Sequence, residues 1–557
     1  MTPLKRFYNL LKLDKKDIYQ IIFYAAFSGL ISLSLPLGVQ AIVNFIQGGQ
    51  VSISWIVLII IVTLGVALVG ILTLMQLRIT ENLQQKIFIR SSFEFAYRLP
   101  KLSFNALYDK YPPEVANRFF DTLTIQKGTS KLLLDFTTAL LQVSLGLILL
   151  SLYHPFFIIF GLLLVVILYI IFKFSFQEGL NTSLKESTFK YKVAYWLQEI
   201  ARNKNTFGRK SNFDYSLNKT DKLVNNYVSF REKHFNVIKR QFSQLIVYKV
   251  FITAGLLSVG GFLVLSQKMN IGQFVAAEII ILLIINSVEK IIIGLETLYD
   301  VLTAVEKIGV VTDLEIQEDF KSTKADLFEN DITLETEEMS YRYPDNDIDI
   351  IKKVNLKILP SEKVFITGNN NSGKTTLVRL LSGFLAPSSG TLYANDNIIK
   401  KSDNGCYKDR IGVVMQDDSL FEGTLLENLT FNNPHIQGED IKWALNAVGL
   451  TTIVKRLPMG LETPINPDGR QLTRSVIQKI MIARAIITRP KILFLEEPTI
   501  SMDAETAQKI TDFLVNPQNN WTVIVSSVDE YWKGACDRHI KMSNGEIVND
   551  TKNRDNA

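Results

Sequence analysis

Long apolar runs dominate the first 310 positions of the chain, whereas later positions alternate between short apolar and polar stretches. Each run supplies about 17 or more largely apolar residues, enough for a helix to cross the roughly 30 Å apolar core of a bilayer. Because lipid offers the backbone no hydrogen-bond partners, such spans must be helical. The pattern therefore predicts six membrane-spanning helices, at Ile18–Ile46, Ile53–Leu77, Leu132–Tyr153, Phe156–Phe172, Phe242–Leu265 and Ile271–Leu295.

The links between these runs differ sharply in length and charge. Three links are short, Gln47–Ser52, His154–Pro155 and Ser266–Asn270, and they carry a single cation, Lys268. The two long links are rich in cations, and cytoplasmic loops carry the excess of Lys and Arg. Both termini and both long links are therefore predicted to be cytoplasmic. The cations of the long links are Arg78, Lys86, Arg90, Arg98, Lys101, Lys110, Arg118, Lys185, Lys190, Lys192, Arg202, Lys204, Arg209 and Lys210.

The long links also carry apolar residues at helical spacing, in Arg78–Tyr108 and Phe189–Ile200, which predicts that the spans continue into the cytoplasm. Each link then contains a break, at Tyr111–Pro113 and at Asn203–Arg209. Short helices at these breaks could contact a cytoplasmic domain, with ordinary loops as the alternative. Within the spans charge is sparse, and Glu278 either lines a substrate path or packs toward a polar cavity.

Composition narrows the picture. The chain has 557 residues, too many for one core, so at least two domains are expected. Its net charge is only +5, with no block of cations typical of nucleic-acid binding. The two cysteines, Cys406 and Cys536, cannot form a disulfide framework and fit a cytosolic domain. The first apolar run is too long for a signal peptide and is expected to be a retained span.

The domain boundary is placed in the acidic stretch Glu306–Asn330. This gives a transmembrane domain at 1–310, a linker at 311–330 and a second domain at 331–557. Alternating apolar and polar residues predict strands at Thr333–Tyr341 and Ile351–Ile358. The fold class is thus multidomain, a six-helix membrane domain followed by an α/β domain.

The strongest chemical motif joins a short apolar run to an apolar helix pattern through a glycine-bounded loop. It matches G-x-x-x-x-G-K-[ST] between a strand and a helix. Glycines let the loop N–H groups point at phosphate oxygens, and the helix adds its positive dipole end. Lys374 would reach the β- and γ-phosphates, and Thr375 would hold Mg²⁺. The nucleoside triphosphate is predicted to contact Gly368, Asn369, Asn370, Asn371, Ser372, Gly373, Lys374, Thr375 and Thr376.

Two further stretches supply polar groups after apolar strands. The run at 411–415 ends in Gln416, whose amide could touch Mg²⁺ or the attacking water. The run at 492–495 ends in two carboxylates, Glu496 and Glu497. On a buried parallel-type strand one carboxylate can approach the metal, and the next can orient or deprotonate water. Tyr343, which precedes the core of the phosphate-loop domain, could stack on adenine.

With these motifs the chain closely resembles the ATP-binding-cassette (ABC) transporters, specifically exporters that fuse six spans to one nucleotide-binding domain. The stretches 419–431 and 457–463 also look like the family. The resemblance implies that Tyr343 stacks on adenine, Gln416 is the Gln-loop residue, Glu497 is the general base and Asp503 is the D-loop aspartate. It also implies ATP and Mg²⁺ as cofactors, with Thr375, Gln416 and Glu496 at the metal. Helices that couple the two domains would lie in 111–121 and 197–207.

The departures from the family pattern concern hydrolysis. The family's Leu-Ser-Gly-Gly-Gln signature loop contacts the ATP of the opposite subunit, and here it is replaced by Leu472, Thr473, Arg474, Ser475 and Val476. Thr473 keeps a hydroxyl, while Arg474 either supplies a cation or blocks closure.

Two further changes affect the site of hydrolysis itself. Val528 stands where the family has its switch histidine, and Glu496 replaces an aspartate. Losing one preorganised transition-state contact costs about 10²–10³ in rate. ATP is therefore expected to be bound well and cleaved slowly.

The resemblance implies one half of a dimeric exporter in the bacterial inner membrane, with a second half transporter that is either a copy of this chain or a competent partner chain. Its first six spans resemble those of type I secretion and bacteriocin exporters, which work with a periplasmic adaptor and an outer-membrane duct. A peptide or protein-like substrate is therefore expected. The alternative is a degenerate ATP-binding scaffold or regulatory subunit of a membrane complex.

Overall fold

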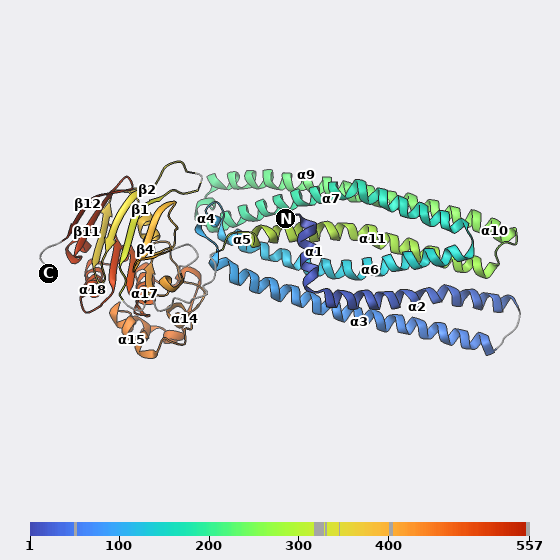
Figure 1. The fold of residues 1–557 in the computed structure, drawn as a ribbon, viewed down its shortest axis with the longest axis horizontal. Helices are drawn as coiled ribbons and strands as arrows, with labels where there is room; N and C mark the ends of the chain where they lie inside the picture. The colour runs from blue at the N-terminus through green and yellow to red at the C-terminus, as the bar shows by residue number, and fades with distance from the viewer. Residues whose placement is uncertain (49–52, 317–327, 329–330, 345, 400–404, 553–557) are drawn as a thin grey trace. The chain divides into compact units, whose positions relative to one another are not determined.

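The computed structural model describes residues 1–557 except 49–52, 317–327, 329–330, 345, 400–404 and 553–557 (Figure 1). The described chain forms two compact units. The first comprises Met1–Pro100 and Lys110–Leu314, and the second comprises Lys101–Asp109 and Glu315–Ala557. Most of the predicted linker, 311–330, lies outside the described residues. The second unit thus includes a short segment from within the helical part of the sequence.

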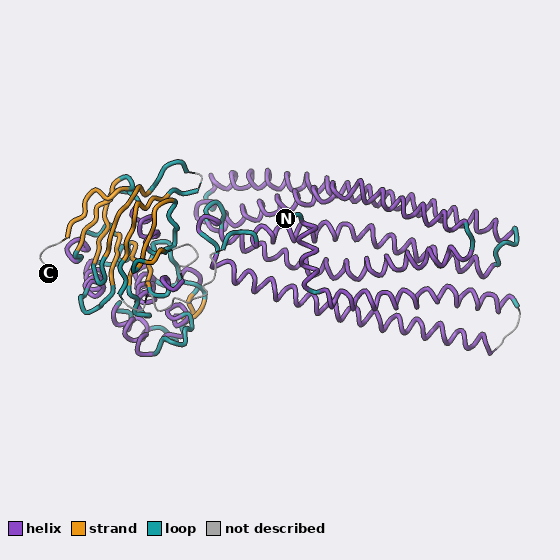
Figure 2. Tube along the Cα trace, in the orientation of Figure 1, coloured by secondary structure: helices purple, strands orange, loops and turns teal. Residues whose placement is uncertain are grey.

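Long helices running side by side make up the first unit (Figure 2). Six helices of the described chain are long and apolar enough to cross a membrane, which confirms the six predicted spans. The predicted extensions are helical over most of their length, since α3 runs to Arg98 within the predicted 78–108 and α7 runs to Arg202. The helices are α1 Pro3–Leu13, α2 Lys15–Gln47, α3 Ile53–Arg98, α5 Pro112–Asn117, α6 Asp121–Tyr153, α7 Phe156–Arg202, α8 Lys204–Phe207, α9 Lys210–Gly255, α10 Gly261–Leu265 and α11 Ile271–Thr312.

Glycines allow α6 and α11 to lie close together. A Cβ added at Gly128 of α6 would lie 2.3 Å from Cγ2 of Val301, and one added at Gly294 of α11 would lie 2.2 Å from Cε1 of Phe136. Small residues at such crossings let helix backbones approach and gain dispersion contacts, which substitute in lipid for a hydrophobic driving force. The α6–α11 pair is therefore a central packing element of the first unit.

Short helices occur near both predicted breaks, α5 at the first and α8 at the second, and their coupling role stays a prediction. The resemblance placed the first coupling helix in 111–121, where the structure has α5 as part of the first unit. The residues grouped with the second unit are Lys101–Asp109, which contain α4 Phe104–Leu107. Ser103 caps α4 by accepting a hydrogen bond from the backbone of Ala106.

Two sheets form the frame of the second unit. One is a four-stranded antiparallel sheet with the order β2-β1-β4-β5, and the other has six strands in the order β12-β11-β3-β10-β9-β6. The predicted strands at 333–341 and 351–358 are present as β1 and β2. The strands are β1 Leu334–Tyr341, β2 Ile351–Ile358, β3 Lys363–Gly368, β4 Ser389–Ala394, β5 Asn397–Ile398, β6 Ile411–Val414, β7 Gly423–Thr424, β8 Pro464–Ile465, β9 Ile492–Glu496, β10 Thr522–Ser526, β11 Arg538–Ser543 and β12 Glu546–Lys552.

Parallel pairing of the six-stranded sheet gathers the polar groups at one edge. Strands β11, β3, β10, β9 and β6 run parallel, so their carboxyl ends meet at the same edge. All five residues of β9 are buried, as its continuous apolar run predicts. The helices of this unit are α12 Lys374–Leu381, α13 Gly405–Lys408, α14 Leu425–Thr430, α15 Gly438–Ala447, α16 Thr451–Arg456, α17 Arg474–Ile486, α18 Ala504–Val515 and α19 Tyr531–Ala535.

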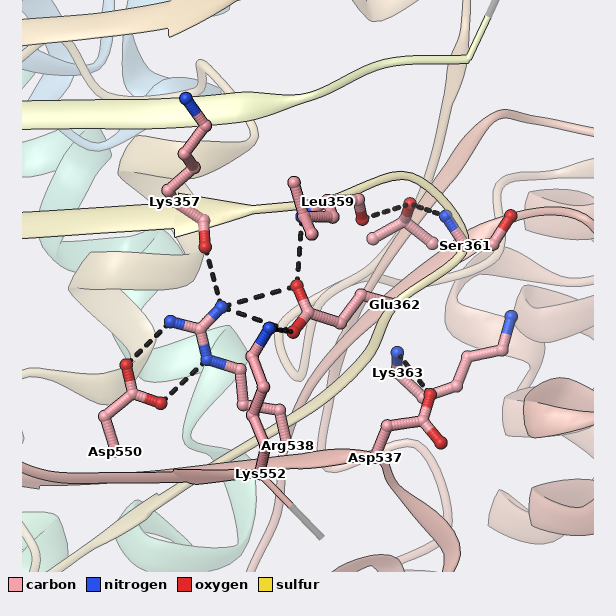
Figure 3. A network of polar contacts seen from close by, with 10 residues as sticks. Lys357, Leu359, Ser361, Glu362, Lys363, Asp537, Arg538, Asp550 and Lys552 are labelled. Atoms are coloured by element: carbon pink, nitrogen blue, oxygen red, sulfur yellow. Dashed lines mark hydrogen bonds and ion pairs between the residues drawn. The ribbon is translucent and has the colours of Figure 1, made fainter. Parts of the chain in front are cut away.

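Arg538, the first residue of β11, forms a buried polar network (Figure 3). The network lies at the end of the sheet opposite the carboxyl ends of its parallel strands. Its guanidinium donates to both carboxylate oxygens of Asp550, at 2.7 and 2.6 Å, and to the carbonyl of Lys357 at 2.6 Å. It also lies 3.3 Å from the Glu362 carboxylate, and both side chains are only 9% exposed. The network joins the β2–β3 turn to β11 and to the last strand, β12.

Replacing Arg538 by Ala is expected to destabilise the β11–β12 edge by about 3 kcal/mol, because the buried Glu362 carboxylate would lose the guanidinium and keep only Lys552 as a charged partner. Faster hydrogen exchange of the β12 amides would report the loss. The hydrogen bonds from Arg538 also lower the pKa of Asp550. That part of the stability is present above the unfolded carboxyl pKa of about 4 and is lost as pH falls through the lower folded value.

The matched control is Arg342→Ala, which removes a more exposed ion pair with Asp349 from the same unit. Such surface pairs contribute about 0–1 kcal/mol. Equal exchange rates in the two variants would contradict the structural role of Arg538.

Candidate functional site

The phosphate-binding loop leaves β3 and enters α12 through two glycines in unusual conformations. Gly368 has φ +153° and Gly373 has φ +98°, and a Cβ at Gly368 would lie 2.3 Å from the carbonyl oxygen of Met542. Side chains are excluded at both positions. Ser372 is 3% exposed, and its Oγ has no hydrogen-bond partner within the described residues. A buried hydroxyl inside this loop fits a site built for an anion that it can bind.

Two predicted metal-binding groups meet beside the loop, and the backbone of Gln416 lies next to them. The Thr375 hydroxyl donates to Oε1 of Glu496, and the backbone N–H of Gln416 lies 3.4 Å from Oε2 of the same carboxylate. The contact follows from the sheet, because Glu496 ends β9 and Gln416 follows β6 at the same edge. A hydroxyl, a carboxylate and an amide are oxygen donors, which Mg²⁺ prefers. The donor set therefore fits Mg²⁺ held together with nucleotide phosphates.

Lys374 lies at the mouth of the loop. Its Nζ donates to the carbonyls of Gly368, at 2.8 Å, and Asn369, at 3.0 Å. Burial lowers the pKa of Lys374, and the nearby Glu497 and Glu496 carboxylates oppose that shift. The ammonium group is thus placed between the loop and the carboxylates of Glu496 and Glu497, where it can contact a bound phosphate.

A pocket of about 300 Å³ extends from the loop to Tyr343. The Tyr343 hydroxyl lies 3.2 Å from Oγ1 of Thr376. The pocket is lined by Tyr343, Ile350, Asn371, Ser372, Gly373, Lys374, Thr375 and Thr376. An aromatic ring at one end and a phosphate-binding loop at the other suit a nucleotide, with its base on the ring.

Two aromatic residues that sequence reasoning did not select also contact Tyr343. Tyr108 stacks on its ring, with centroids 5.5 Å apart and planes at 24°, and the Phe104 ring lies 6.1 Å away. Both belong to the Lys101–Asp109 segment of the second unit. Neither Tyr108 nor Phe104 lines the 300 Å³ pocket. They support the Tyr343 ring without forming the pocket wall.

Replacing Tyr108 by Ala is expected to weaken ATP binding about 2- to 10-fold, because an aromatic pair contributes about 0.5–1.5 kcal/mol to holding Tyr343 in place. Titration with a fluorescent ATP analogue would measure the loss. Tyr108→Phe keeps the ring and should bind as the original chain does. An unchanged affinity in Tyr108→Ala would show that the stack has no part in nucleotide binding.

Glu497 follows Glu496 and is held by the segment after β10 and by α17. Its Oε2 accepts hydrogen bonds from the Ser527 hydroxyl at 2.9 Å and from the Val528 N–H at 3.2 Å. Gln478 of α17 donates to the carbonyl of Glu497 and accepts from the N–H of Ser501. These bonds fix a residue whose backbone has φ +46°. The carboxylate is therefore oriented by the Ser527 hydroxyl and the backbone N–H of Val528. Val528 is the residue at which the resemblance expects a histidine.

Neither Ser527 nor Gln478 was selected from the sequence. Ser527 directly follows β10, which pairs in parallel with β9, so its closeness to Glu497 follows from the register Ser526↔Glu496. Gln478 lies on α17, and no motif connects it to β9. The parallel pairing of β9 and β10 could have predicted the contact between Ser527 and Glu497 from the sequence. The contact between Gln478 and Glu497 depends on how α17 packs, which the sequence pattern does not give.

The residues at the predicted signature-loop position begin α17. Thr473 is the N-cap, and its side chain accepts a hydrogen bond from the Val476 N–H. Thr473 and Arg474 are exposed, and none of Thr473, Arg474 and Ser475 lines the pocket of their own chain. Asp503 similarly caps α18 by accepting from the N–H of Thr506.

Comparison with known proteins identifies the second unit. Residues 351–500 match the family described as ABC transporter. The chain is 34% identical over 195 residues to the probable microcin-H47 secretion/processing ATP-binding protein MchF of Escherichia coli, covering 35% of this chain and 28% of that protein. It is 29% identical over 332 residues to the alpha-hemolysin translocation ATP-binding protein HlyB of Escherichia coli O157:H7, covering 59% and 46%.

A third relative, the leukotoxin export ATP-binding protein LtxB of Aggregatibacter actinomycetemcomitans, is 27% identical over 337 residues, covering 60% of this chain and 47% of that protein. The matched region spans less than half the length of each of these relatives. Among solved structures, a bacterial Atm1-family ABC exporter with ATP bound aligns with a TM-score of 0.81 at 18% identity, covering 97% of this chain and 95% of that one. Residues 351–500 therefore match the ABC transporter family, and the chain as a whole has the fold of an ABC exporter.

Proposed function

We propose that this chain is one half of an ATP-driven exporter in the bacterial inner membrane, with both termini cytoplasmic. The observation that carries the proposal is the meeting of Thr375, Glu496 and Lys374 beside the Tyr343 pocket, in a chain that also has six spanning helices. The excess of cations in the long links supports the orientation. ATP binding would supply the free energy that drives closure of the second units on one another.

Each group of the site has a distinct part in this proposal. The loop N–H groups and Lys374 bind the phosphates, and Tyr343 stacks on the base. Thr375 and Glu496 hold the metal, with Gln416 beside it. Bound Mg²⁺ offsets phosphate charge and so stabilises the transferring group. Glu497 orients or deprotonates the attacking water, and Ser527 and the Val528 N–H hold its carboxylate in place.

The working unit in this proposal is a dimer. Thr473, Arg474 and Ser475 do not line the pocket of their own chain, which agrees with a role across an interface. As the N-terminal turn of α17, they would present N–H groups to the ATP of a second chain. Arg474 and Ser475 replace glycines of the family pattern, and Val528 replaces its histidine. Hydrolysis by a pair of identical chains is therefore expected to be slow.

The names of the relatives support a secretory substrate. They describe proteins for alpha-hemolysin translocation, leukotoxin export and microcin secretion. We infer that this chain exports a peptide or a protein, together with a periplasmic adaptor and an outer-membrane duct.

A second function is favoured by the same departures. With Val528 and Arg474 at positions that support hydrolysis in the family, the chain would serve as an ATP-binding regulatory subunit or as the partner of a competent ABC chain. In this case ATP binding would gate the complex, and the partner would supply turnover.

ATPase activity of the purified chain in lipid separates the two functions. Turnover of the chain alone above about 1 s⁻¹, near the lower end of enzyme rates, would exclude the regulatory function. Glu497→Gln should remove that activity, because the amide cannot accept the proton of water. No turnover alone, with turnover restored by a co-purifying ABC protein, would establish the partner role and rule out the self-sufficient exporter.

A further inference from the structure

A groove of about 630 Å³ lies at the beginning of α2, in the first unit. The proposed function does not use it. Its lining combines cationic and aromatic side chains, namely Lys15, Lys16, Tyr19, Gln20, Phe23 and Tyr24. Because α2 is long and apolar enough to span a membrane, this groove lies where a spanning helix emerges from its polar flank.

An exposed aromatic stripe runs along α2 from the groove. Tyr19, Phe23 and Phe27 follow at intervals of four residues, so they share one face of the helix. Their exposed fractions are 69%, 57% and 47%, and the Phe23 and Phe27 rings lie 4.7 Å apart. Tyrosine, with an apolar ring and a polar hydroxyl, is enriched at the membrane–water interface. The stripe therefore offers an apolar surface that begins at interface level and continues along the span.

The packing of α2 on α3 leaves a net positive charge at the groove. The two acidic residues of this stretch are paired with α3, Asp14 with Arg90 at 2.9 Å and Asp17 with Lys86 at 2.5 Å. Lys15 and Lys16 are exposed, and neither forms an ion pair within the described residues. Because Asp14 and Asp17 pair with cations of α3, no carboxylate of this stretch balances the ammonium groups of Lys15 and Lys16 at the groove.

We propose that this groove binds an anionic phospholipid. The ammonium groups of Lys15 and Lys16 contact the headgroup phosphate, and an acyl chain lies along Tyr19 and Phe23. Each lysine near an anionic membrane surface contributes attraction, and burial of the chain against the rings adds a hydrophobic term. A zwitterionic lipid has the same tail but no net charge, so the two lysines select for a net negative headgroup.

Native mass spectrometry of the full chain in detergent, titrated with phosphatidylglycerol or phosphatidylcholine, tests the proposal. Lys15→Gln/Lys16→Gln should weaken phosphatidylglycerol binding about 30-fold, whereas the control Lys5→Gln/Lys12→Gln should weaken it less than about threefold. The control removes the same charge from exposed lysines of α1. Excess inorganic phosphate should not displace the lipid, because the acyl chain is part of the contact.

Phe23→Ala provides an independent test that leaves the charges intact, and it should also weaken phosphatidylglycerol binding. An unchanged helical content by circular dichroism and an unchanged thermal unfolding temperature show that each variant is folded. Equal losses in the two lysine variants would mean diffuse attraction to a basic surface and would overturn the proposal. So would equal binding of phosphatidylcholine and phosphatidylglycerol by the original chain, or full affinity in Phe23→Ala.

Discussion

Replacing Lys374 by Ala is expected to abolish detectable ATP binding at micromolar nucleotide. The Nζ of Lys374 lies at the loop mouth, within reach of the carbonyls of Gly368 and Asn369, where a phosphate would take over its hydrogen bonds. A hydrogen bond between charged groups contributes about 1.5–3 kcal/mol, so its loss should lower affinity by up to about a hundredfold. Equilibrium binding of a fluorescent ATP analogue to the purified chain measures the effect.

Lys442→Ala is the matched control, because Lys442 is an exposed lysine of α15 in the same unit. It should bind ATP as the original chain does. Equal affinity in Lys374→Ala would show that the loop between β3 and α12 is not the phosphate-binding site, and the proposed function would fail with it.

Restoring the family residues is expected to accelerate hydrolysis by about 10²–10³ for each transition-state contact regained. The changes are Val528→His, and Thr473→Ser, Arg474→Gly, Ser475→Gly and Val476→Gln. Val528 is 66% exposed, so an imidazole can replace it without displacing the core. Its backbone N–H already contacts the Glu497 carboxylate, which places the new ring close to the general base. Phosphate release by the purified chain in lipid measures the gain.

The signature-loop changes alter the beginning of α17, so they are best made separately from Val528→His and then combined. Adding Glu497→Gln to the restored chain should remove the whole gain, because every restored contact serves attack by the same water. An unchanged rate after restoration would mean that a step other than cleavage limits turnover. Nucleotide affinity should stay within about twofold, because ground-state binding depends on Lys374 and the loop N–H groups.

The membrane helices could be predicted because a span needs only length and low polarity. Their ends were harder to place, since α6 begins at Asp121 and not at Leu132, where the apolar run starts. Outside the bilayer the pattern changes from a continuous run to an amphipathic one, so hydropathy alone marks only the inner part. The same change of pattern correctly predicted the extensions of α3 and α7.

Within the candidate site, the residues that could be predicted from the sequence are those whose positions the backbone determines. The loop residues are contiguous, and Glu496 and Gln416 end parallel strands, so the sequence places them at one sheet edge. Whether these residues bind ATP and Mg²⁺ stays a prediction. The contact between Tyr108 and Tyr343 joins residues 235 positions apart through side-chain packing, which no local pattern encodes. Gln478 was missed for the same reason, because its contact with Glu497 depends on how α17 packs.

The membership of Lys101–Asp109 in the second unit bears on any attempt to study the ATPase part in isolation. A fragment cut at Glu315 would contain every motif residue yet leave behind Phe104, Tyr108 and Asn105, which pack on Tyr343 and Tyr341. Tyr341 and Tyr343 would then face solvent. The solubility and the nucleotide affinity of such a fragment would be lower than those of the complete second unit. Residues 101–109, supplied as a peptide or grafted onto the fragment, would restore the missing piece.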